Sequence, residues 1–205
     1  MTFGDYGIMV NINQSTEQVL FVQGGGEGAH AADAKLVASL REQLGSGYGV
    51  RYPLMPKEDD PNYATWKQCI AEELANVGDN LLLVGHSVGA SVLLKFLADG
   101  GCKHSLAGVF LIAPPFLHDD EVWRWQEAEL PKDVADRLPR GLPVFLYHGR
   151  EDEIVPFSHQ AMYAKALPHA TVRALEGRNH QMNDDLTEVA DDIKRVSARV
   201  DDEPA

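Results

Sequence analysis

Residues 80–101 decide the fold; their sequence is Asn80-Leu-Leu-Leu-Val-Gly-His-Ser-Val-Gly-Ala-Ser-Val-Leu-Leu-Lys-Phe-Leu-Ala-Asp-Gly-Gly101. The apolar run after Asn80 predicts a central parallel strand, because such strands are covered on both faces. Residues 88–98 predict a buried helix, which the glycine pair at 100–101 ends. Between strand and helix, residues 85–89 match G-x-S-x-G. This pattern predicts a very tight turn that projects the hydroxyl of Ser87 above the strand end.

The same alternation of strand and helix extends along the chain in both directions. Short apolar runs predict further strands at 19–22, 49–52, 106–113, 142–147 and 170–175, and helical spacing predicts helices at 29–44, after Asp60-Pro61, at 157–167 and at 186–200. Asp60 is the expected N-cap of the second helix, with Pro61 at its first position. Alternating strands and helices predict an α/β fold, with a mostly parallel sheet and helices on both faces.

One segment, at about 115–141, interrupts the alternation and contains Trp123, Trp125 and three prolines. We expect a small, partly helical insertion that lies over one end of the sheet. No segment has the composition of an interdomain linker. Residues 1–205 are therefore expected to form a single domain, with a core at about 19–200 and a frayed tail at 201–205.

The composition excludes several classes of protein. The chain has 18 Lys+Arg against 31 Asp+Glu, a formal net charge of −13, so its field would repel nucleic acid. Its two cysteines, Cys69 and Cys102, lack the spacing of a zinc site and cannot form a disulfide framework. No secretory signal is visible, and no apolar run is long enough to cross a bilayer. A cytoplasmic protein without nucleic-acid or membrane partners is expected.

A serine nucleophile needs a base, and the base needs an orienting acid. In this architecture the acid and the histidine follow the nucleophile in that order, on loops after later strands. Asp152 follows the strand predicted at 142–147, between Glu151 and Glu153. We favour Asp152 among the three because the following Ile-Val-Pro segment at 154–156 would hold the loop while the aspartate points back toward the site.

The base is chosen from eight histidines by position. His180 follows the final predicted strand, lies behind a glycine and precedes the last amphipathic helix. His159 and His169 lie in or beside helical stretches, and His148 precedes the acid. His86, inside the tight turn, is interpreted as a packing or hydrogen-bonding neighbour, since its side chain leaves the turn in another direction.

The tetrahedral intermediate of acyl transfer needs two N–H donors, which form an oxyanion hole. The backbone N–H of Val88, directly after the nucleophile, supplies one. The glycine-rich loop at 23–28 should supply the other, from Gly25 with Gly26 as the alternative. A phosphate-binding loop is excluded because the segment lacks the lysine of G-x-x-x-x-G-K-[ST].

Four ordered segments together resemble the α/β-hydrolase family, in particular its small, nearly lidless serine hydrolases and the subgroup related to retinoblastoma-binding protein 9 and bacterial relatives. They are Phe21-Val-Gln-Gly-Gly25, Gly85-His-Ser-Val-Gly89, His148-Gly-x-x-Asp-x-x-Val-Pro156 and Gly177-x-x-His180. Gln23 departs from the histidine usual in relatives, which alters the hydrogen bonding that braces the loop. The resemblance implies that Ser87 attacks, His180 relays the proton and Asp152 holds the imidazole, without a metal or organic cofactor.

The expected substrate is a small-molecule acyl compound, and the expected activity is hydrolysis of short, soluble carboxylic esters, because the insertion is too short for a large cap. A thioesterase or amidase would use the same residues, and a binding or scaffold protein with little turnover is a third possibility. The sequence does not predict the oligomeric state. Five candidate substrate contacts lie near the predicted site or in the insertion: Glu27, His30, Met55, Trp123 and Trp125.

Overall fold

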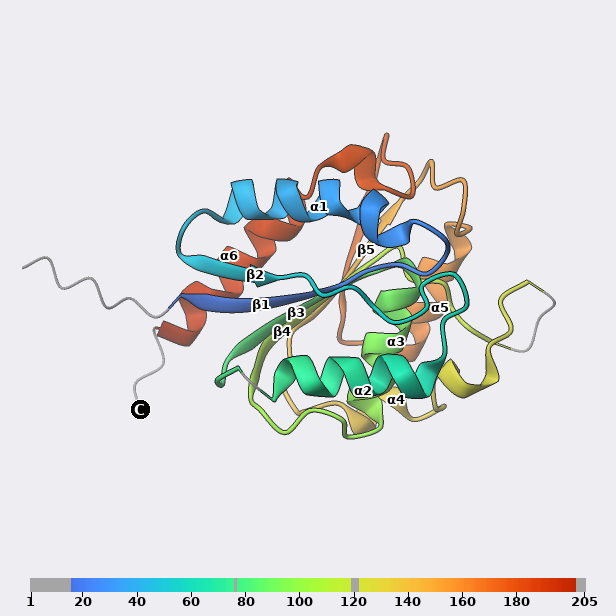
Figure 1. The fold of residues 1–205 in the computed structure, drawn as a ribbon, viewed down its shortest axis with the longest axis horizontal. Coiled ribbons are helices and arrows are strands. Elements are labelled where there is room, and N and C mark those ends of the chain that lie inside the picture. The colour runs from blue at the N-terminus through green and yellow to red at the C-terminus, as the bar shows by residue number, and fades with distance from the viewer. Residues whose placement is uncertain (1–15, 76, 119–121, 202–205) are drawn as a thin grey trace, which may run out of the picture.

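The computed structural model describes residues 16–75, 77–118 and 122–201 (Figure 1). These residues form a six-stranded sheet in the order β2-β1-β3-β4-β5-β6, and all its strand pairs are parallel. The strands are β1 (Glu17–Val22), β2 (Tyr48–Arg51), β3 (Leu81–His86), β4 (Leu106–Ile112), β5 (Val144–Gly149) and β6 (Thr171–Leu175). The α-helices are α1 (Ala29–Leu44), α2 (Tyr63–Leu74), α3 (Ser87–Ala98), α4 (Val134–Arg137), α5 (Ser158–Ala166) and α6 (Thr187–Asp201). The predicted α/β fold with a parallel sheet is confirmed.

Helices cover both faces of the sheet, with α1 and α6 packed on one face and α2 and α3 on the other (Figure 1). Alternate residues of each strand point to opposite faces, so the strands contribute to two apolar cores. Leu83 of β3 belongs to the core beneath α2, α3 and α5, while Leu82 belongs to the core beneath α1 and α6. The central strands are apolar throughout because both of their faces are buried.

The strand order reverses between β1 and β3. After β1 the chain turns to one side of the sheet to form β2, and then returns across β1 to form β3. In open α/β sheets, ligands bind outside the carboxyl ends of the strands at such a reversal. The glycine-rich loop after β1 and the turn after β3 both lie at this end of the sheet.

The start of α2 corrects one prediction. The N-cap is Asn62 rather than Asp60, and its side chain accepts a hydrogen bond from Thr65 N at 3.2 Å. Pro61 therefore precedes the cap instead of occupying the first helical turn. Asp and Asn are equally good caps, so the sequence alone does not separate positions two residues apart.

The predicted insertion at 115–141 contains two short helical segments, the 3₁₀ helix η1 (Gln126–Ala128) and α4. Of the tail predicted to be frayed, Asp201 ends α6, and residues 202–205 lie outside the described part of the chain. Among the described residues, none of the helices is both long and apolar enough to span a membrane.

Candidate active site

The turn between β3 and α3 has the predicted strained conformation. Ser87 has a φ of 51°, in the left-handed region that side chains other than glycine rarely adopt. The two flanking glycines are required by space. A Cβ at Gly85 would lie 2.6 Å from the Cα of Ala90, and one at Gly89 would lie 2.0 Å from the carbonyl oxygen of Gln23. Ser87 is held at the N-terminus of α3, where backbone N–H groups are available to an anion.

The glycine-rich loop approaches this turn closely, since a Cβ on Gly25 would lie 3.3 Å from the Cβ of Val88. The neighbouring amides are occupied: Gly24 N donates to Asp33 Oδ2 at 2.8 Å, and Gly26 N donates to the carbonyl oxygen of Glu58 at 2.6 Å. In the described part of the chain, Gly25 N has no hydrogen-bond acceptor. This arrangement favours Gly25 over Gly26 as the second donor, beside Val88.

Gln23 and Glu58 hold the loop in place. Gln23 is fully buried; its Oε1 accepts from Met55 N at 3.0 Å and its Nε2 donates to Glu58 Oε2 at 2.6 Å. The Glu58 carboxylate also accepts from Gly28 N at 3.0 Å and His30 N at 2.7 Å, and so caps the N-terminus of α1. These bonds, first that from His30, keep the pKa of Glu58 below its ordinary value although partial desolvation opposes them.

The acid and the histidine meet after β5 and β6. His180 Nδ1 lies 2.8 Å from Asp152 Oδ2, and Asp152 Oδ1 accepts from the backbone N–H groups of Ile154 at 2.9 Å and Val155 at 2.8 Å. His148 Nε2 lies 3.2 Å from Asp152 Oδ2. Burial alone would raise the pKa of Asp152, but the hydrogen bonds from His148 and His180 hold it well below its ordinary value. The carboxylate is therefore ionised at neutral pH.

Gly149, the last residue of β5, allows these two loops to meet. A Cβ there would lie 2.0 Å from the carbonyl oxygen of Arg178, two residues before His180. Arg178 is itself anchored to the start of α6 by Asp185 at 2.7 Å and Glu188 at 3.0 Å. The backbone of the histidine loop can thus pack directly on the end of β5.

Ser87 and His180 line one small cavity, of about 190 Å³. The glycine-rich loop, Ile154 and Gln181 also line this cavity. Of the five predicted substrate contacts, Glu27 lines this cavity. Among the described residues that line it, Glu27 and Asp33 contribute carboxylates, and His86 and His180 contribute imidazole rings.

The other four predicted contacts do not line the cavity, and the structure gives a reason for each. Met55 is 1% exposed and belongs to the core beneath α2 and α3, while Trp125 packs against the same core. The His30 ring stacks on Tyr52 with ring centroids 4.2 Å apart. Trp123 packs edge-on against His159 at 5.2 Å.

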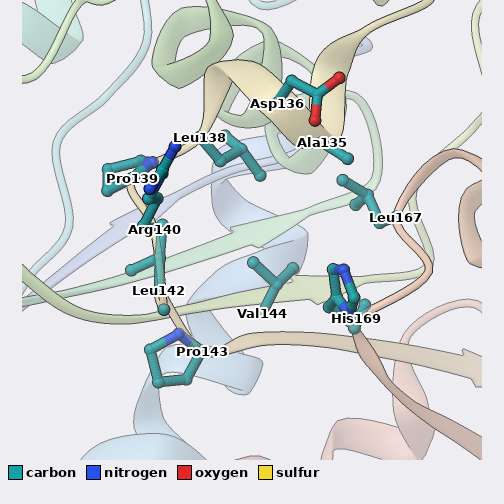
Figure 2. Close-up of a pocket in the computed structure, with 12 residues that line it drawn as sticks. Ala135, Asp136, Leu138, Pro139, Arg140, Leu142, Pro143, Val144, Leu167 and His169 are labelled. Carbon is teal, nitrogen blue, oxygen red and sulfur yellow. The ribbon is translucent and has the colours of Figure 1, made fainter.

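A larger cavity, of about 560 Å³, lies elsewhere (Figure 2). It opens beside the start of β5, between α4 with its following loop and the end of α5, and Leu138, Leu142 and Leu167 form much of its wall. Asp152 follows the opposite end of β5. No serine, threonine, cysteine or lysine is among the described residues that line this cavity.

Comparisons with known proteins agree with this geometry. The family model described as "Serine hydrolase" matches residues 40–186, which include Ser87, Asp152 and His180. A search of curated proteins finds no match. Three solved structures share the fold. The ydeN gene product from B. subtilis has a TM-score of 0.70 and 19% sequence identity, and the match covers 89% of this chain and 100% of that chain. Est1E from Butyrivibrio proteoclasticus has a TM-score of 0.66 and 17% identity over 93% of this chain and 90% of that chain, and Arabidopsis thaliana SOBER1 has a TM-score of 0.64 and 15% identity over 89% of this chain and 100% of that chain.

Proposed function

Since the chain belongs to the serine hydrolase family and has the α/β-hydrolase fold, we propose that it hydrolyses small carboxylic esters through an acyl-enzyme intermediate. Ser87 is the proposed nucleophile, His180 the base and Asp152 the orienting acid. One observation carries the proposal: His180 lines the same cavity as Ser87 while its Nδ1 is hydrogen-bonded to Asp152 at 2.8 Å. This leaves Nε2 as the ring nitrogen available to the serine.

The proposed reaction has two stages. Ser87 Oγ attacks the ester carbonyl and passes its proton to His180 Nε2, while the oxyanion accepts hydrogen bonds from the N–H groups of Gly25 and Val88. His180 then gives that proton to the leaving alkoxide, and the acyl group remains on Ser87. In the second stage His180 takes a proton from water, the resulting hydroxide attacks the acyl-enzyme, and the carboxylic acid leaves as Ser87 regains its proton.

The proposal is tested with a fluorophosphonate probe, which forms a covalent bond only with an activated serine. Intact-mass measurement should show a single adduct on the native protein, and peptide mapping should locate it at Ser87; heat-denatured protein should remain unlabelled. An unlabelled but well-folded native protein would overturn the proposal and favour a scaffold with little turnover. Esters, thioesters and amides of one acyl group, assayed side by side, distinguish an esterase from the thioesterase and amidase alternatives.

The size of the cavity predicts that long acyl groups react no better than short ones. At about 190 Å³ it is smaller than the roughly 300–1,000 Å³ of pockets that enclose drug-sized ligands. Methylene groups beyond the first few therefore stay in water and contribute none of the ~0.8 kcal/mol each that burial would give. We expect kcat/KM to rise no further from 4-nitrophenyl butyrate to the decanoate, measured below its critical micelle concentration. A faster reaction with the decanoate would show that the acyl chain binds elsewhere.

A further inference from the structure

A second carboxylate–histidine pair, formed by Asp33 of α1 and His86 of the nucleophile turn, lies in the wall of the cavity that Ser87 and His180 line. Each side chain is 1% exposed. His86 Nδ1 lies 2.9 Å from each oxygen of the Asp33 carboxylate. The reaction proposed above gives neither residue a chemical step.

Asp33 connects the three segments that carry the site. Its Oδ2 accepts from Gly24 N at 2.8 Å, in the loop that carries Gly25. Its Oδ1 accepts from Gln181 Nε2 at 3.1 Å, next to His180. Through His86 it also contacts the nucleophile turn. A single buried carboxylate therefore links the oxyanion loop, the turn before Ser87 and the histidine loop.

The two ring nitrogens of His86 both face oxygen acceptors. Nδ1 faces the Asp33 carboxylate, and Nε2 lies 3.1 Å from the backbone carbonyl oxygen of His180. A backbone carbonyl only accepts, and neutral imidazole carries one N–H, so only imidazolium can donate both bonds. Burial opposes that charge, but the charge and hydrogen bond of Asp33 outweigh it and raise the pKa of His86. The same pairing lowers the pKa of Asp33 despite its own burial.

We propose that Asp33 keeps His86 as a buried imidazolium, and that this ion pair positions the carbonyl of His180 and the oxyanion loop relative to Ser87. Asp33 and His86 are positioning residues, since neither touches the reacting atoms in the proposed mechanism. The inference rests on the proposed function for its effect on turnover, whereas the protonation state of His86 is independent of any activity.

The Asp33→Asn variant removes the negative charge of residue 33 while keeping the shape of its side chain. The amide has nearly the same volume, and its oxygen can still accept from Gly24 N. Its nitrogen can donate to Gln181 Oε1, a buried atom that has no partner among the described residues, after the Gln181 amide rotates. His86 next to a neutral amide has lost its hydrogen-bonded counter-ion, and the charge of Asp152 acts on it without a hydrogen bond. His86 therefore loses a proton and gives up one of its two bonds. The variant should therefore fold. It should lose one of the two hydrogen bonds of His86, either that to the His180 carbonyl or that to residue 33.

The experiment measures steady-state kinetics on a short ester together with histidine ring ¹⁵N NMR. In the native protein both ring nitrogens of His86 should carry protons at neutral pH. The signals of His86 are identified as those missing from the spectrum of the His86→Gln variant. In Asp33→Asn one proton should be lost, and kcat should fall about 10- to 100-fold with KM changed less than about 3-fold, because misplaced reacting groups cost mainly turnover.

Asp192→Asn is the matched control. Asp192 is buried like Asp33, with 2% of its surface exposed, but it does not line the cavity. Its carboxylate accepts from Tyr147 Oη at 2.9 Å and from Arg173 Nη2 at 2.8 Å. The Asp192→Asn substitution should lower the melting temperature but leave kcat within about 2-fold of the native value. A loss of kcat equal to that of Asp33→Asn would assign the effect of both variants to general destabilisation and overturn the proposal.

Two further results would overturn the proposal. One is a native His86 with a single ring proton at neutral pH, which needs no variant to observe and no working active site. The other is an Asp33→Asn protein that loses the proton yet keeps native kcat. If instead the native protein shows a doubly protonated His86 but no phosphonate adduct, the proposed function fails while the buried imidazolium stands.

Discussion

Ser87→Ala is expected to lower kcat for a short ester by about 10⁶-fold, because removing a nucleophile from an intact triad leaves only the oxyanion hole and substrate binding. Phosphonate labelling should disappear entirely. The fold should be little affected, since Ser87 Oγ makes no hydrogen bond within the described residues and alanine meets the same left-handed φ of 51°. Initial rates, intact mass and the melting temperature of the same preparation check all three statements.

Ser91→Ala is the control on the same helix. Ser91 is buried, and its Oγ donates to the carbonyl oxygen of Pro115 at 2.7 Å and accepts from Tyr163 Oη at 3.1 Å. Its loss should cost about 1 kcal/mol of stability and leave labelling intact. Activity of Ser87→Ala above about 1% of native would place the nucleophile on another residue.

The sequence was sufficient to predict the sheet and the order of its elements because the decisive patterns are local. Three such patterns lie within residues 81–98: the apolar run at 81–84, the glycines at 85 and 89, and the apolar spacing in α3. That Asp152 and His180 lie close together could also be predicted, because parallel strands bring the loops that follow them to one edge of the sheet. Asp152 and His180 are 28 residues apart, yet topology alone places both loops at the carboxyl end of β5 and β6.

The supports of the site could not be predicted in the same way. Glu58 caps α1 and braces Gln23, which lies 35 residues earlier in the chain, and Asp33 contacts Gln181 across 148 residues. Neither residue has a local pattern that marks such a contact, because an acidic residue in a loop or on a helix is most often solvated. Their roles depend on which loops meet at the reversal between β1 and β3.

The same reasoning explains the substrate contacts. Met55 and the two tryptophans were proposed from their place in the chain, near a strand end or in the insertion. Whether such a side chain points into a cavity or into the core depends on packing between distant elements. The structure buries Met55 and packs Trp125 against the core instead. Neither residue is among those that line the cavity.

Asp152→Asn is expected to lower kcat by about 10⁴-fold while leaving the loop folded. The amide oxygen can still accept from the N–H groups of Ile154 and Val155, which hold the loop. The amide nitrogen, however, then faces His180 Nδ1 and donates to it. This selects the tautomer with a proton on Nε2, which cannot take the proton of Ser87.

The control for Asp152→Asn is Glu151→Gln, one residue earlier on the same loop. Because the side chain of Glu151 is exposed, this substitution should leave kcat within about 2-fold of the native value.

A second measurement on Asp152→Asn concerns the free energy of unfolding. Because the folded pKa of Asp152 lies below its unfolded value of roughly 3.9, the ionised carboxylate stabilises the fold above that pH, and its contribution is lost as the pH falls through the folded pKa. Urea unfolding should therefore show native protein more stable than Asp152→Asn at pH 7, with the difference shrinking below about pH 4. An equal difference at both pH values would mean that the loss comes from packing, and a variant with native kcat would remove Asp152 from the triad.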